Sequence, residues 1–179
     1  ENVLDLLNEI YNNDYWLTYG GHIGTDKYKF PADYFTPVDW SKSLRNQRFC
    51  LSHLKSHKFF LLKNIKNKDL CYRNGNLFRY PDDVIMYIPM AEMSGPKHSF
   101  YIKDKVYYYN MHDNCDFQNK SRHAHMTDII KNDLSFRPAY KQKSKNDLKN
   151  SICDWKSYKL RLTFIFANKV LGYVFLDVS

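Results

Sequence analysis

The spacing of apolar residues in the first half of the chain predicts three helices and one buried strand. Residues 1–12 carry apolar side chains at every third or fourth position, which is typical of an amphipathic helix. Residues 15–19 are aromatic and β-branched and precede two glycines, which predicts a short buried strand. Residues 44–65 carry one apolar stripe and predict the clearest helix. Residues 82–93 predict another helix, kinked at Pro89 because proline removes a backbone donor.

The second half of the chain reads mainly as strands. Residues 99–109 predict a β-hairpin, and residues 126–134 predict a short helix. Residues 141–149 are polar and charged, as in a linker or an exposed segment. Two apolar runs, residues 160–166 and 170–176, predict a further pair of strands. Strands interleaved with helices indicate an α/β fold with a C-terminal β-rich extension.

Composition excludes several classes of protein. The 179 residues are 44% hydrophobic and 17% aromatic, too apolar for a disordered chain. No apolar run reaches the roughly 18–20 residues that span a bilayer, so no membrane span is expected. The four cysteines are widely spaced and predict reduced thiols, which together with the lack of a signal peptide favours a cytoplasmic location. The chain begins inside a helical pattern without Met, so we expect it to be part of a longer polypeptide.

The net charge of +8 suits nucleic acid or other anionic partners, but it also suits a lysine-rich solvated surface. The lysines are scattered, and the sequence shows no known nucleic-acid-binding motif, which makes nucleic acid an unlikely partner. His53 and His57 have the spacing of a metal-ligand pair if they lie on a helix, but Leu54 stands where the zinc protease pattern has Glu. A surface or capping role is therefore favoured for these histidines.

Carboxylates and aromatic residues supply the other candidate chemistry. Asp82 and Asp83 open a predicted helix, where they either cap it or act as a general base. Glu92, on the same helix, is either a second functional carboxylate or a buried ion-pair partner. The glycine turn at Gly20 and Gly21 allows close approach of a ligand, although a tight turn alone explains it. The tyrosines of residues 107–109 suit sugar stacking or ordinary packing.

Several of these motifs follow one another in a recognisable order. The order is WLTYG at residues 16–20, Arg45 and Arg48, SHLK at 52–55, Asp83, PMAEMSG at 89–95 and YYYN at 107–110. It resembles the second, acceptor-side half of the family-two-like glycosyltransferases of the GT-A fold, over residues 1–140. The resemblance implies a partial GT-A-like (Rossmann-like) mixed sheet flanked by helices. Residues 141–179 match no known pattern and are expected to form a separate extension.

The resemblance also implies a reaction. Such enzymes transfer a sugar from a nucleotide sugar, such as a UDP-sugar, to a hydroxyl of a glycan or protein acceptor. A divalent metal, Mn²⁺ or Mg²⁺, lies on the donor diphosphate, held by an Asp-rich motif in the first half of the domain. Both the nucleotide-binding half and this motif are missing from the sequence, so the chain is expected to depend on the rest of a longer polypeptide.

Residue roles follow by matching motif positions. The resemblance implies that Asp83, or failing it Asp82, deprotonates the acceptor hydroxyl, with inversion at the sugar. The loop over residues 22–40 would face the acceptor, and His112 would approach the metal or diphosphate. Two other readings remain open: a non-catalytic glycan-binding or structural module, and a basic nucleic-acid-binding domain. The residues expected to bind acceptor or donor are Trp16, Tyr19, Gly20, Gly21, Arg48, His53 and Glu92.

Overall fold

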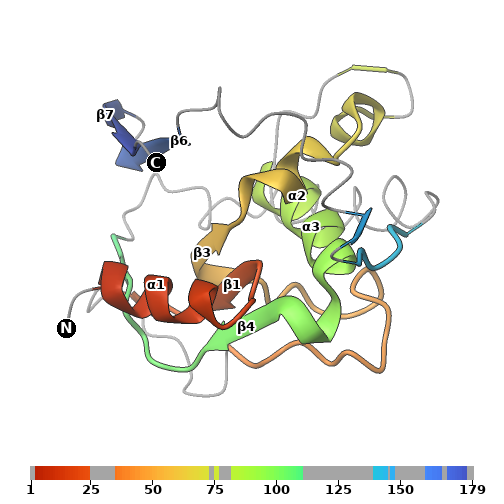
Figure 1. Ribbon diagram of the computed structural model, residues 1–179, viewed down its shortest axis with the longest axis horizontal. Coiled ribbons are helices and arrows are strands. Elements are labelled where there is room, and N and C mark those ends of the chain that lie inside the picture. Colours follow the sequence, from red (N-terminus) through yellow and green to blue (C-terminus); the bar gives the residue numbers. More distant parts are fainter. Residues whose placement is uncertain are drawn as a thin grey trace. The chain divides into compact units, whose positions relative to one another are not determined.

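The computed structural model describes residues 3–24, 35–72, 75–76, 82–110, 139–144, 146–147, 160–166 and 169–176 (Figure 1). The chain divides into two compact units, Glu1–Lys143 and Ser144–Ser179. The predicted helix over residues 126–134 lies outside the described residues. None of the helices in the part of the chain that the structure describes is long and apolar enough to cross a membrane.

A three-stranded mixed sheet forms the centre of the first unit. Its middle strand is β1 (Leu17–Gly20), which pairs antiparallel with β3 (Ser52–His57) and parallel with β4 (Ser99–Ile102). All four residues of β1 are buried, as its aromatic and β-branched sequence predicts. The register between β1 and β3 is irregular, because Thr18 faces Ser56 whereas Gly20 faces Ser52. The mixed sheet and its flanking helices agree with the expected α/β class.

A second, two-stranded sheet corrects the predicted hairpin. Strand β2 (Ile23–Gly24) pairs in parallel with β5 (Tyr108–Tyr109), and the backbone N–H of Ile23 donates to the carbonyl of Tyr107 at 2.9 Å. The hairpin over residues 99–109 is therefore wrong, because β4 and β5 belong to different sheets. Each of the two strands pairs with a strand from the start of the chain, and these non-local pairs leave no local signal in the sequence.

The predicted long helix over residues 44–65 is also wrong. Residues 52–57 form strand β3, and only α2 (Phe59–Lys63) is helical, followed by a 3₁₀ turn, η1 (Asn67–Leu70). The apolar stripe is real, since Leu51 and Leu61 are both buried, but pairing with β1 satisfies the backbone of the stretch between them. Serine and histidine, which fill four of the six positions of β3, are weak helix formers, so tertiary pairing decides the conformation.

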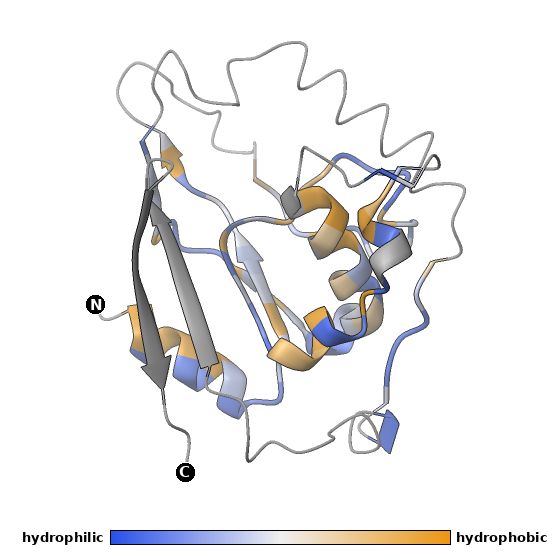
Figure 2. Ribbon diagram, turned by 90° about the horizontal axis from the view of Figure 1, so that it is seen from above, coloured by the Kyte–Doolittle hydropathy of each residue, from blue (hydrophilic) through white to orange (hydrophobic). Residues whose placement is uncertain are grey.

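Two helices flank the sheet. Helix α1 (Val3–Asn12) shows apolar and polar residues on different sides (Figure 2), and its Tyr11 hydroxyl lies 2.7 Å from Ser56 Oγ on β3. Helix α3 (Asp82–His98) contacts β1 and β4 and supplies much of the core. Its helical dihedral angles break at Gly95 (φ 62°), and Pro89 lies inside the helix. The α3 residues that are 2% exposed or less include Val84, Ile85, Ile88, Met90, Ala91 and Met93.

The second unit contains a β-hairpin. Strands β6 (Leu160–Phe166) and β7 (Lys169–Leu176) pair antiparallel from Leu160 opposite Leu176 to Phe166 opposite Lys169. The register shifts between Phe164 and Ile165, which places a bulge near the turn. The two strands predicted from the apolar runs are confirmed.

Candidate functional site

Trp16 lies in the core beside the first strand. Its side chain is 1% exposed, and its ring stacks on His98 with centroids 3.7 Å apart and planes at 2°. Phe60 contacts the same ring edge-on at 5.3 Å. The imidazole of His98 in turn bonds through Nδ1 to the backbone carbonyl of Asp14 at 2.8 Å. The structure therefore uses Trp16 for packing between α2, α3 and β1.

Tyr19 and the two glycines after it pack closely against neighbouring segments of the protein. Tyr19 is 2% exposed, and its hydroxyl accepts a hydrogen bond from the backbone N–H of Val38 at 3.1 Å. Burial raises the pKa of this tyrosine. A Cβ at Gly20 would lie 2.6 Å from the carbonyl oxygen of Ile102, and one at Gly21 would lie 2.9 Å from Phe35. Glycine is required here by packing against protein atoms.

Glu92 is the partner in a buried ion pair. Its carboxylate accepts hydrogen bonds from Arg45 Nε at 2.7 Å and from Arg45 Nη2 at 2.8 Å, a bidentate arrangement. The two side chains are only 7% and 5% exposed. The backbone N–H of Tyr140 donates a third bond to Glu92 at 3.0 Å. Of the two readings of Glu92 that the sequence left open, the structure selects the ion-pair partner.

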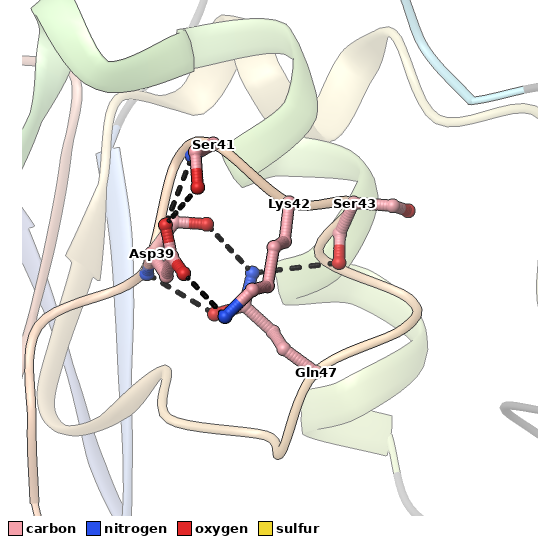
Figure 3. A network of polar contacts seen from close by, with 5 residues as sticks. All are labelled: Asp39, Ser41, Lys42, Ser43 and Gln47. Atoms are coloured by element: carbon pink, nitrogen blue, oxygen red, sulfur yellow. Dashed lines mark hydrogen bonds and ion pairs between the residues drawn. The ribbon is translucent and has the colours of Figure 1, made fainter.

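The loop that carries Arg45 is organised by its own polar contacts (Figure 3). Asp39 accepts hydrogen bonds from the backbone N–H and the hydroxyl of Ser41 at 3.1 and 2.6 Å, and pairs with Lys42 at 2.8 Å. These contacts, led by Lys42, lower the pKa of Asp39 to about 2. The side chain of Gln47 donates to the carbonyl of Asp39 at 3.0 Å and closes the loop. The folded loop presents Arg45 to α3.

Residues 139–143 run alongside α3, a contact that no sequence pattern revealed. The Tyr140 hydroxyl donates to Asp69 and accepts from the backbone N–H of Lys66 at 3.1 Å. Burial and the bond to Asp69 raise the pKa of Tyr140 to about 12. Further along, the backbone N–H of Lys143 donates to the carbonyl of Met93 at 2.8 Å. The segment thereby ties η1 to α3.

Asp82 and Asp83 are the first two residues of α3, as predicted. Backbone N–H groups of a first helical turn lack intrahelical partners, and the helix dipole there favours a negative charge. One turn later on the same helix face as Asp83, Tyr87 lies with its hydroxyl 3.3 Å from His57 Nδ1 on β3. The side chains of both aspartates, and the whole of His112, lie outside the described residues. Arg48 is exposed in the loop before β3.

His53 belongs to an aromatic cluster, not to a helix face shared with His57. Its ring stacks on Tyr107 with centroids 4.6 Å apart and lies 5.5 Å from both His22 and Tyr109. Among the side chains that the structure describes, no group of three or more His, Cys, Asp or Glu residues could hold a metal ion.

Because of His22, the stability of the folded chain is expected to depend on pH. Burial, with a smaller effect of the charges of Lys55 and Lys105, lowers its pKa from 6.5 to about 4. The unfolded chain therefore binds a proton more readily, and stability present above pH 6.5 is lost as the pH falls towards 4. We expect the wild-type chain to lose roughly 1–2 kcal/mol more of its free energy of unfolding than the His22→Gln variant over this pH range, after allowance for solvent screening.

Urea unfolding followed by circular dichroism between pH 7.5 and 4.5 measures this effect. His57, whose pKa burial also lowers, contributes in the same direction in both proteins and cancels from the difference. Parallel stability curves for the wild-type chain and the His22→Gln variant would contradict the assignment.

Comparison of the chain with protein-family models, curated proteins and solved structures finds no significant match to any of the three.

Proposed function

We propose that the chain is the acceptor-side half of an inverting, GT-A-like glycosyltransferase. The observation that carries the proposal is the start of α3 at Asp82 and Asp83, on the helix that packs against the central strand β1. The resemblance requires an aspartate at the start of this helix and a mixed sheet beside it. Glu92, Arg45 and Tyr140 are bonded to one another further along the same helix.

The proposed chemistry is a single displacement. Asp83 takes the proton of the acceptor hydroxyl, and the oxygen forms a bond to the anomeric carbon of the donor sugar as the bond from that carbon to the diphosphate oxygen breaks. The first-turn position favours the ionised carboxylate, which is the form that accepts a proton. A divalent metal would neutralise the leaving diphosphate on the upstream half of the domain.

Calorimetric titration with UDP-sugars and Mn²⁺ tests the proposal, performed on this chain and on the longer polypeptide that contains it. We expect binding and sugar transfer by the longer polypeptide only. Nucleotide-sugar binding by the isolated chain would contradict the expectation that it lacks the donor-binding half of the domain. Absence of both binding and transfer in the longer polypeptide would contradict the proposed enzymatic activity and favour a non-catalytic module.

The alternative is a non-catalytic glycan-binding or structural module derived from such an enzyme. One observation favours it: Trp16, Tyr19, Gly20 and Glu92 all have packing or ion-pair partners within the protein. A descendant that kept only the fold would keep these residues as well. The two readings therefore differ at Asp83, which an enzyme needs for transfer and a binding module does not.

A further inference from the structure

Tyr87 joins helix α3 to strand β3. The helix packs against β1 and β4, and Tyr87 adds a contact with the third strand of the central sheet. Its hydroxyl lies 3.3 Å from Nδ1 of His57, and its ring meets the imidazole edge-on with centroids 5.6 Å apart. The ammonium group of Lys55, also on β3, lies 5.4 Å from the centroid of the same ring. Because Tyr87 is only 6% exposed, these contacts are made inside the protein.

These contacts hold the ring of Tyr87 more narrowly than apolar packing would. A hydrogen bond depends on both distance and angle, and a cation prefers the face of an aromatic ring. Burial lowers the pKa of His57, so its imidazole is neutral at pH 7 and has one donor and one acceptor nitrogen. The Tyr87 hydroxyl both donates and accepts, so its contact with Nδ1 forms with either tautomer.

The side of α3 that Tyr87 anchors is the side that begins at Asp83. Successive residues of an α-helix lie about 100° apart around its axis, so Tyr87 lies about 40° from Asp83 and roughly one turn along. Val84 and Ile85 are buried as well, but they lie about 100° and 200° from Asp83 and face other directions. The contact of Tyr87 with β3 therefore sets the rotation of the turn that carries Asp83.

We infer that Tyr87 is a positioning residue for the proposed sugar transfer, whose contact with His57 holds the first turn of α3 where Asp83 reaches the acceptor hydroxyl. This inference rests on the proposed function, because Tyr87 acts only through the general base. A general base works within hydrogen-bond reach of its proton, and a misplacement of about 1 Å costs up to about a hundredfold in rate. Loss of the contact should slow the chemical step and leave donor binding unchanged.

Sugar transfer by the polypeptide that contains this chain tests the inference. Tyr87→Phe keeps the ring and removes the hydroxyl, and we expect kcat to fall roughly tenfold while the KM for the donor stays the same. Tyr11→Phe is the matched control, since the Tyr11 hydroxyl also contacts β3, at 2.7 Å from Ser56 Oγ, but belongs to α1. This control should keep the wild-type kcat.

A double variant shows whether Tyr87 acts through His57. Tyr87→Phe and His57→Phe remove the two sides of one contact, so combining them should lower kcat no further than Tyr87→Phe alone. Full addition of the two losses would contradict a shared role and overturn the inference. Unfolding midpoints of all variants are measured on the same preparations, because a merely structural role would lower kcat only in step with the midpoint.

Hydrogen exchange in this chain gives a second readout that needs no enzymatic activity. In an α-helix the backbone N–H groups of Met86 and Tyr87 pair with the carbonyls of Asp82 and Asp83, so their exchange reports opening of the first turn. We expect exchange about three- to tenfold faster in Tyr87→Phe than in Tyr11→Phe, the effect of losing one neutral hydrogen bond.

Equal exchange rates in Tyr87→Phe and Tyr11→Phe, or equal kcat values, would overturn the inference and leave the proposed function standing. Faster exchange in Tyr87→Phe, together with a wild-type polypeptide that transfers no sugar, would contradict the proposed function, and the role of Tyr87 would fall with it. The two failures are therefore distinguished by the exchange rates.

Discussion

Replacing Asp83 by Asn is expected to abolish sugar transfer by the polypeptide that contains this chain, while nucleotide-sugar binding persists. Loss of a general base lowers transfer by roughly 10²–10⁴-fold. Asparagine has nearly the same shape and is tolerated at helix starts, so α3 should begin at the same place. Transfer rates and calorimetric donor binding, measured on one preparation, separate chemistry from folding.

Asp82→Asn is the matched control, because Asp82 is the neighbouring carboxylate in the same first turn. We expect this variant to keep most of its transfer activity. Full activity in Asp83→Asn together with loss of activity in Asp82→Asn would show that Asp82, and not Asp83, is the general base. Full activity in both variants would contradict a general base at this helix start and leave the non-catalytic module as the better reading.

Short-range patterns in the sequence predicted the elements that depend on local periodicity. Helix α1, strand β1, helix α3 and the strands β6 and β7 were each visible as apolar periodicity bounded by glycine, asparagine or charged residues. The mixed α/β class followed from their order. The positions of Asp82 and Asp83 at the start of α3 followed from the same pattern.

The sequence could not predict elements that depend on distant partners. Strand β3 reads as part of a helix because its flanking leucines keep helical spacing, and only β1, more than thirty residues earlier (Leu17 opposite His57), makes it a strand. The partner of Glu92 was equally hidden, since Arg45 comes from a loop without regular structure. The position of Tyr87 could have been predicted, because it follows Asp83 by four residues, which places both residues on one helix face.

Replacing Glu92 by Ala is expected to lower the free energy of unfolding by about 3–5 kcal/mol, because it breaks a buried, bidentate ion pair by removing one of its two partners. The variant also removes the acceptor for the backbone N–H of Tyr140, which loosens residues 139–143 from α3. Urea unfolding followed by tryptophan fluorescence measures the effect, since Trp16 lies in the core between α2 and α3.

The double variant Arg45→Met, Glu92→Leu separates charge from shape. Apolar side chains of similar size remove both buried charges at once, so we expect it to recover much of the stability that Glu92→Ala loses. Lys42→Ala is the control for a surface pair, because Lys42 and Asp39 are exposed and the bonds of Asp39 to Ser41 and Gln47 remain, and its unfolding midpoint should match the wild type. A Glu92→Ala midpoint no lower than that of Lys42→Ala would show that the buried pair does not hold α3 in place. The position of α3 against β1 and β4 would then depend on its buried apolar residues alone.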